Sequence, residues 1–340
     1  MNFHLLKNKF LYSVHTSTPL GWSSGLLGLY SLIFTLFKFS NAQSISMIIL
    51  GGVGIFLLPW VVTIRYRWLP ARITIPTPAN GDHPLNDKVS LCISSIFEQE
   101  GDLLLSYNRN NIVGGLRINE GRKMSMNMMA QFMHKYFPAT SEESDQFDWV
   151  AFKACYDSPE THIFYQNGEN KLEEYDKYKI APRSICKIHY EKDAELDYRK
   201  ALDLLPVGSV LALKLPKEAD REYAYLIGNT HYEPNQSMSA ITDIEELEMC
   251  LNTAWMVIAL MHPGGHNVCL PFLGKGYSGM SGYAYGILWT IVFTYRKKSS
   301  HHHKGVYNYG INLCLPFSVM MRNDLKIRQV ASFLTYALRG

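Results

Sequence analysis

The residues best suited to do chemistry form a glycine-rich loop that follows a short apolar run. Val268–Leu270 predicts a buried strand, and a helix is expected to start near Ser281. A glycine loop between a strand and a helix offers backbone N–H groups and a positive dipole end to an anion. The loop therefore predicts a site for the phosphates of a small molecule. Its contact residues are expected to be Leu273, Gly274, Lys275, Gly276, Tyr277, Ser278 and Gly279.

Two common nucleotide motifs do not fit this loop. The glycines match Gly-x-Gly-x-x-Gly, but a dinucleotide site also needs an acidic residue about 20 positions further on. The chain has no Asp or Glu from Met280 to Asn323, which disfavours a Rossmann dehydrogenase. A Walker A loop is excluded because Gly276, not Ser or Thr, follows Lys275. Basic residues dominate this region, so it is expected to favour anions, although some of the charges complement a helix C-terminus. They are Lys275, Arg296, Lys297, Lys298, Lys304 and Arg322.

No catalytic residue and no metal ligand is predicted. The tract His301–His303 has no acidic partner nearby and indicates a solvated loop. His262 and His266 flank a Pro-Gly-Gly turn and are expected to be structural. None of the six cysteines belongs to a Cys-x-x-Cys pair, which favours reduced core thiols over a zinc site. No Gly-x-Ser-x-Gly elbow surrounds Ser278, so it is not a predicted nucleophile.

Two apolar runs precede this region. Residues 20–37 and 45–64 contain no charged side chain, and each is close to the roughly 20 residues that cross a bilayer. The short connection between them predicts a helical hairpin. Basic residues flank both ends, with Lys7 and Lys9 before the hairpin and Arg65 and Arg67 after it. By the positive-inside rule we expect a multi-pass protein of the cell inner membrane, with its C-terminal domain in the cytoplasm.

The chain is thus expected to comprise a membrane part (residues 1–72), a linker rich in Pro, Asn, Gly and Asp (73–87) and a domain (88–340). In that domain, strands and helices alternate, which predicts a layered α/β domain with a mostly parallel sheet. Residues 139–200 give no clear pattern. The expected strands are Val89–Ile93, Leu103–Tyr107, Ser209–Leu215, Tyr223–Ile227, Val268–Leu270 and Val306–Leu315, and the expected helices are Met124–Tyr136, 242–261, one from about 281 and one over 327–338.

Three segments resemble the macro domain, an α/β/α family that binds ADP-ribose. Val89–Ile93 with the turn at Ser95 and Ile96 resembles its first strand and adenine-contacting turn. Leu103–Tyr107 with Asn108 resembles the strand that ends in an asparagine near the distal ribose, and residues 268–279 resemble the diphosphate loop. The resemblance implies a three-layer α/β/α domain with a mixed, mostly parallel sheet, and ligand contacts from Ser95, Ile96 and Asn108. Two features depart from the family: Ser95 replaces its usual Asp, and its second glycine-rich loop is reduced to Asn110–Gly115.

A two-span hairpin joined to such a domain resembles the membrane-anchored macro-domain effectors of bacterial Thoeris antiphage defence. The resemblance implies a non-enzymatic effector without a cofactor. Its ligand would be an ADP-ribose conjugate, an NAD-derived signal made by a partner TIR-domain protein. Binding would lead to a homo-oligomer that disrupts the lipid bilayer. The balance of 33 basic to 30 acidic residues gives no sign of a nucleic-acid partner. Two alternatives remain open: a membrane-anchored ADP-ribosyl hydrolase, and a membrane scaffold with a vestigial pocket.

Overall fold

The chain divides into two compact units, Met1–Ala71 and Arg72–Gly340. The computed structural model describes most of the second unit and a few residues of the first. The described residues are 52–54, 56–57, 72–75, 89–113, 128–138, 147–184, 204–231, 244–262, 265–273, 284–301, 309–316, 319–320, 323 and 325–339.

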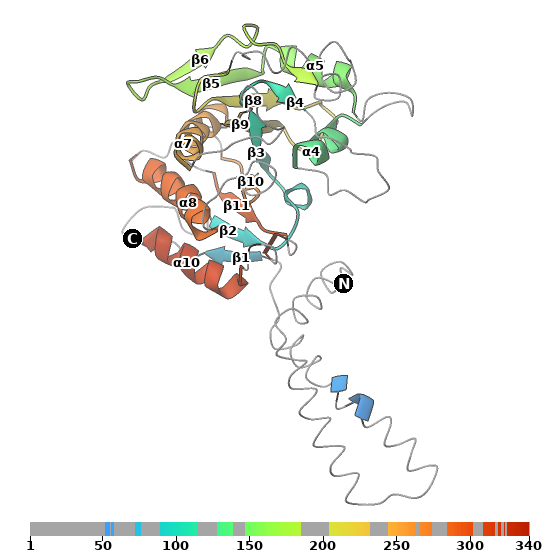
Figure 1. Ribbon diagram of the computed structural model, residues 1–340, viewed down its shortest axis with the longest axis vertical. Helices are drawn as coiled ribbons and strands as arrows, with labels where there is room; N and C mark the ends of the chain where they lie inside the picture. Colours follow the sequence, from blue (N-terminus) through green and yellow to red (C-terminus); the bar gives the residue numbers. More distant parts are fainter. Residues whose placement is uncertain are drawn as a thin grey trace, which may run out of the picture. The chain divides into compact units, whose positions relative to one another are not determined.

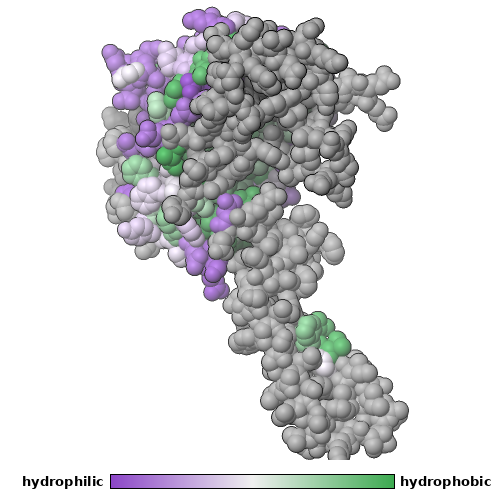
Figure 2. All heavy atoms as spheres, viewed as in Figure 1, coloured by the Kyte–Doolittle hydropathy of each residue, from purple (hydrophilic) through white to green (hydrophobic). Residues whose placement is uncertain are grey.

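The first unit contributes only residues 52–54 and 56–57, which are helical and mostly apolar (Figure 2). They belong to the second predicted span; the rest of that span and all of residues 20–37 lie outside the described residues. Within the part of the chain that the structure describes, no helix is both long and apolar enough to traverse a bilayer. The hairpin therefore stays a prediction.

The second unit is built on a nine-stranded sheet with the order β1-β2-β11-β10-β3-β9-β8-β5-β6 (Figure 1). A separate parallel pair joins β4 to β7. The strands are β1 (Arg72–Ile75), β2 (Val89–Cys92), β3 (Asp102–Asn108), β4 (Ile112–Val113), β5 (His162–Gln166), β6 (Leu172–Tyr175), β7 (Arg183–Ser184), β8 (Val210–Lys214), β9 (Tyr223–Thr230), β10 (Val268–Leu270) and β11 (Ile311–Cys314).

The sheet is mixed, as the sequence predicts. The central strands β2, β11, β10, β3 and β9 are parallel to one another, and their residues are almost completely buried. Short apolar runs such as Leu103–Leu105 suit this position, because helices cover both faces of a parallel sheet. The parallel character is confined to this centre: β1 pairs with β2, and β8 with β9, in the antiparallel sense, as do β5 and its two partners.

Helices cover both faces of the sheet, which gives the expected three layers. On one side lie α7 (Ile244–Met261), α8 (Ala284–His301) and α10 (Ile327–Arg339); on the other lie α4 (Met128–Tyr136) and α5 (Trp149–Asp157) (Figure 1). Alternate residues of each strand serve the two layers. Leu103 and Leu105 pack in one cluster with Phe132 and Phe152 from the α4 and α5 side. The described cysteines are free, and four of the five are buried, as expected for core thiols.

The sequence-based interpretation misses strands at both edges of the sheet. Ile73–Ile75, in the predicted linker, belong to β1, so the second unit starts at Arg72 and not at residue 88. The unassigned region 139–200 supplies α5, β5, β6 and β7. The β5–β6 hairpin is an edge with exposed charged residues, including Glu169, Lys171 and Glu173, and it is hydrophilic in Figure 2. Such charges discourage pairing with another chain.

The tight turn before β3 generates a stability prediction. Gly101 has φ +118°, and a Cβ there would overlap the carbonyl of Asn267. Gly101→Ala is expected to lower the free energy of unfolding by about 2–4 kcal/mol, because the strain and the clash add. Gly286→Ala is the matched control: it lies in α8 with open space around it and should stabilise by up to about 1 kcal/mol. Denaturant titration of the full chain tests the pair, and equal effects of the two changes would contradict this account.

Candidate functional site

The centre of the sheet contains a topological switch point between β10 and β3. From β10 the chain continues through α8 to β11 on one side, whereas β3 lies beside β9 on the other. β10 and β3 themselves pair in parallel, with Val268 opposite Asp102. In open α/β sheets, ligands bind outside the carboxyl ends of the strands at such a point. Asn108 at the end of β3 and Leu273 after β10 both belong to this edge.

Asn108 lies in a turn in which the oxygen of its side-chain amide accepts a hydrogen bond, whereas the nitrogen donates none to a described residue. Its Oδ1 accepts a hydrogen bond from the backbone N–H of Asn110 at 2.8 Å, and its carbonyl accepts from Asn111 N–H at 2.9 Å. No described residue accepts a hydrogen bond from its Nδ2. The residue is 8% exposed, so its amide has little freedom to turn. The result is a fixed NH₂ donor at the switch point.

Asn111 connects this turn to the core through hydrogen bonds of its side chain. The residue is completely buried and has φ 57°. Its side chain accepts from the hydroxyl of Tyr107 and donates to the carbonyl of Ile180 and, at 3.1 Å, to the hydroxyl of Tyr156. Burial raises the pKa of Tyr107 above its ordinary value and that of Tyr156 to about 12, so both remain neutral phenols. Tyr156 and Ile180 belong to the region that the sequence left unassigned. That region therefore helps to position Asn108.

Ser95 and Ile96 lie in the turn after β2, and their side chains differ in exposure. Ser95 precedes a 3-10 helix, η1 (Ile96–Glu98); its Oγ accepts from Phe97 N–H at 3.4 Å, and its own N–H donates to Glu98 Oε2 at 3.3 Å. This reciprocal pair is a capping box. The side chain of Ile96 is completely buried in the core. Ser95, which is half-buried, is thus the residue of the two whose side chain reaches the surface.

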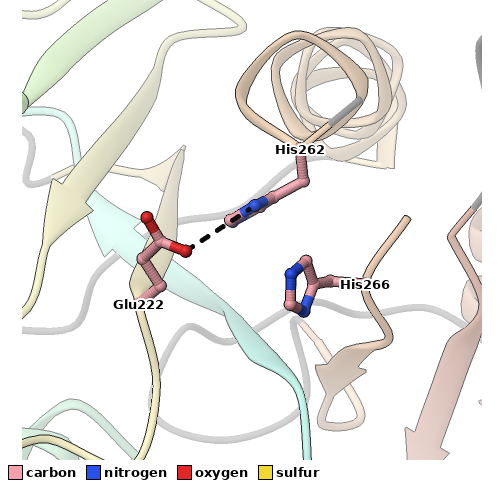
Figure 3. Close-up of side chains that lie close together, drawn as sticks. All are labelled: Glu222, His262 and His266. Carbon is pink, nitrogen blue, oxygen red and sulfur yellow. Dashed lines mark ion pairs between the residues drawn. The ribbon is translucent and has the colours of Figure 1, made fainter. Parts of the chain in front are cut away.

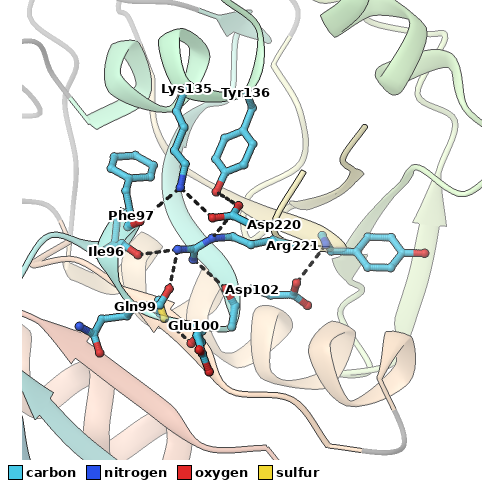
Figure 4. Close-up of polar contacts among 12 residues, drawn as sticks. Ile96, Phe97, Gln99, Glu100, Asp102, Lys135, Tyr136, Asp220 and Arg221 are labelled. Carbon is cyan, nitrogen blue, oxygen red and sulfur yellow. Dashed lines mark hydrogen bonds and ion pairs between the residues drawn. The ribbon is translucent and has the colours of Figure 1, made fainter. Parts of the chain in front are cut away.

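Arg221, just before β9, fixes the segment that follows Ser95 (Figure 4). Its guanidinium donates to the carbonyls of Ile96, Gln99 and Gly101 at 2.9, 2.6 and 2.7 Å. The residue is 8% exposed. A planar group with five fixed donors is well suited to gather several carbonyls of one loop.

Asp220 lies beside this guanidinium and links it to α4. Its carboxylate accepts from Lys135 at 2.9 Å and from the Tyr136 hydroxyl at 3.0 Å. Partial burial acts to raise the pKa of Asp220, but the two hydrogen bonds and the positive charges of Lys135 and Arg221 together lower the pKa below its usual value. Asp220 therefore stays ionised. The loop after β2, the start of β9 and α4 form one polar network.

The glycine loop itself is described only up to Leu273, which is buried. Gly274, Lys275, Gly276, Tyr277, Ser278 and Gly279 lie outside the described residues. The first residue of α8 that is described is Ala284, and Arg296 is 12 residues further along, about 18 Å at 1.5 Å per residue. Arg296 also donates to the carbonyl of Ala337 in α10. The basic end of α8 is therefore far from the first described residue of that helix.

Sequence reasoning did not single out Arg221 or Asn111. An Asn-Asn pair directly after a strand is a turn signal, because asparagine tolerates a positive φ and bonds to nearby backbone. It identifies a turn at residues 110–111, but not the tyrosine partners, which come from distant parts of the chain. The sequence around Arg221 does not indicate its hydrogen bonds, because their acceptors lie 120 or more residues away in the chain.

No family model and no curated protein matches this chain. Solved structures with some likeness include a mutant of the Oceanobacillus iheyensis macrodomain, at 13% identity and a TM-score of 0.36, covering 71% of this chain and 93% of that one. A Trypanosoma brucei macrodomain shows 10% identity and a TM-score of 0.36, and the match covers 78% of this chain and 74% of that one. The Trypanosoma brucei macrodomain in complex with ADP-ribose shows 9% identity and a TM-score of 0.35, and the match covers 79% of this chain and 78% of that one. These scores are too low to assign a function to the chain.

The Arg221 network generates a second prediction. Arg221→Met keeps the length of the side chain but leaves three carbonyls without their donor. We expect the free energy of unfolding to fall by about 3 kcal/mol, because hydrogen bonds to charged groups contribute more than neutral ones. Arg328→Met, at an exposed position of α10, should change it by less than about 0.5 kcal/mol. Denaturant titration measures both, and an Arg221→Met protein as stable as the control would show that the network does not hold the loop.

Proposed function

We propose that the second unit binds ADP-ribose, or a conjugate that contains it, at the carboxyl edge of β2, β10 and β3. The observation that carries this proposal is the Nδ2 donor of Asn108, which makes no hydrogen bond to a described residue and lies at the switch point, beside the strand that leads into the glycine loop. The diphosphate would lie against the backbone N–H groups of residues 274–279, with Lys275 adding charge. Asn108 would donate to a hydroxyl of the distal ribose.

The adenine would lie near the turn after β2. Ser95 offers a hydroxyl there in place of an aspartate, so its contact with the adenine amino group would be between neutral groups and weaker than one from a carboxylate. The diphosphate loop and Asn108 would then contribute most of the affinity.

We further propose that the protein is a membrane-bound effector of antiphage defence. The two uncharged runs at residues 20–37 and 45–64 support membrane insertion, and the resemblance to Thoeris effectors supports an NAD-derived signal from a TIR-domain partner. A ligand shifts a protein only when it binds one state more tightly than another. Ligand binding would therefore favour an assembled state of the chain, in which the spans gather and disrupt the bilayer.

One observation favours a second candidate, an ADP-ribosyl hydrolase. His231 follows β9 directly, and its Nδ1 lies 3.5 Å from Oε2 of Glu246 in the first turn of α7. β9 is the neighbour of β3, so a histidine and a carboxylate lie one strand away from Asn108. Such a pair is able to act as a general acid or base. Mass spectrometry of the ligand separates the candidates: an effector returns it unchanged, whereas a hydrolase releases ADP-ribose from a modified protein and loses this activity in His231→Ala.

Isothermal titration of the full chain in detergent with ADP-ribose tests the proposed site. We expect Asn108→Asp to weaken binding at least tenfold. The aspartate keeps the Oδ1 acceptor for Asn110 N–H but replaces the NH₂ donor with an anionic oxygen near the ligand's phosphates. Asn170→Asp, in the exposed β5–β6 turn, is the matched control and should bind as the unaltered chain does. Failure of the unaltered chain to bind ADP-ribose or any conjugate of it would refute the proposal.

The membrane role is tested separately, with the full chain reconstituted into vesicles that contain a self-quenched dye. Products formed from NAD by a TIR-domain protein are expected to release the dye, because ligand binding would gather the membrane spans. The Asn108→Asp chain should release little at the same ligand concentration. Binding without dye release would leave the ligand site intact and contradict the effector mechanism alone.

A further inference from the structure

A cluster of metal-ligand side chains lies at the opposite edge of the sheet, where the parallel strands begin. Glu222 directly precedes β9, His266 comes two residues before β10, and His262 follows the last residue of α7. Their side chains converge from three separate elements (Figure 3). Asp102, next to the cluster, is the first residue of β3, and Asn108 is the last. The two edges are therefore about 20 Å apart at 3.3 Å per residue.

The potential ligand atoms are close together. One nitrogen from each histidine and one oxygen of Glu222 all lie within 4.8 Å of one another. The Nδ1 atom of His262 is 4.0 Å from Oε2 of Glu222, and the centroids of the two imidazole rings are 4.6 Å apart. Tetrahedral zinc with bonds of about 2.0–2.2 Å places its ligand atoms roughly 3.4 Å apart, so a closure of about 1 Å is enough. Glu222 and His266 are exposed and free to make this adjustment.

A buried carboxylate lies next to the imidazole ring of His262. Its Nε2 lies 2.7 Å from Oδ2 of Asp102, and the side chains are 6% and 4% exposed. The other carboxylate oxygen, Oδ1, accepts from Tyr223 N–H at 3.0 Å. With Nε2 against this carboxylate, Nδ1 is the ring nitrogen that faces Glu222. That atom makes no hydrogen bond to any described residue and is directed toward Glu222. In zinc sites, a carboxylate commonly lies next to the ring nitrogen that does not bind the metal and orients the imidazole.

Nearby contacts leave Oε2 of Glu222 available and set the course of the backbone before His266. Lys214 donates to Oε1 of Glu222 at 2.9 Å, which leaves Oε2 for another partner. Gly265 has φ +84°, and its N–H donates to the carbonyl of His262 at 3.2 Å. This turn ends α7 and returns the chain so that His266 lies against His262. Glycine is needed here because other residues rarely adopt this backbone conformation.

We propose that Glu222, His262 and His266 bind a divalent transition-metal ion of the zinc class. Two imidazole nitrogens and one carboxylate oxygen are a ligand set that suits Zn²⁺, with water at the fourth position. The hard ions Ca²⁺ and Mg²⁺ prefer sites made of oxygen atoms and are disfavoured here. The bound ion would fasten the end of α7 to the starts of β9 and β10. It lies at the far edge from Asn108, so this site is independent of the proposed ligand site.

The test uses the full chain in detergent, stripped of metal with a chelator and then titrated with ZnCl₂ or CoCl₂. We expect visible absorption bands of tetrahedral Co²⁺ and a higher melting temperature with Zn²⁺. Elemental analysis should give one ion per chain when residues 301–303 are replaced by alanine. His266→Ala and Glu222→Gln are expected to weaken binding at least tenfold, because even a change in the outer shell costs that much. Both residues are exposed, so circular dichroism should show an unchanged fold.

Two further variants make the result decisive. His134→Ala removes an exposed histidine of α4 and should leave the affinity unchanged. A triple alanine variant of residues 301–303 removes the histidine tract, whose first residue is the last of α8, together with any metal that the tract binds. The proposal holds if this variant keeps the tetrahedral Co²⁺ bands. It is overturned if binding persists in both His266→Ala and Glu222→Gln, or disappears with the tract alone.

Discussion

The parallel pairing of β10 with β3 is the contact on which both edges of the domain depend. It is short, with Val268 opposite Asp102 and Cys269 opposite Leu103. It nevertheless joins the strand that leads into the glycine loop to the strand that ends at Asn108. Because the strands are parallel, the same pairing brings the start of β10, with His266, close to Asp102 at the start of β3. One pair of strands thus sets the geometry of two separate groups of polar side chains.

Hydrogen bonds of buried polar side chains favour one packing of the segments around this sheet over the alternatives. Asn111 follows β3 and Arg221 precedes β9 in the sequence, and each forms hydrogen bonds with partners that apolar packing alone would not align. An unpaired buried amide or guanidinium costs more than its hydrogen bonds contribute, so alternative packings that break these contacts are disfavoured. The region 147–184 joins this scheme through Tyr156 and Ile180 and is therefore part of the framework.

The sequence predicts the central strands well, because each is a short run of apolar residues bounded by turn signals. Val268–Leu270 has the same bounds in the structure, and β2, β3, β8 and β9 differ by one to three residues at an end. It also places Ser95, Asn108 and Leu273 after strands that share an edge. It misses β1, β5 and β6, whose residues are more polar because they form antiparallel edges open to water on one side. The approach of His262 to Glu222 depends on tertiary pairing and has no local signal.

The order of the strands in space has a consequence for how the protein is made. β2 and β3 emerge from the ribosome early, yet their neighbours β10 and β11 come more than 150 residues later. Contacts between such distant segments form slowly and only after long loops close. A nascent chain therefore has a complete N-terminal region long before Asn108 has its neighbouring strand. The central parallel strands of the sheet are therefore complete only when synthesis is almost finished.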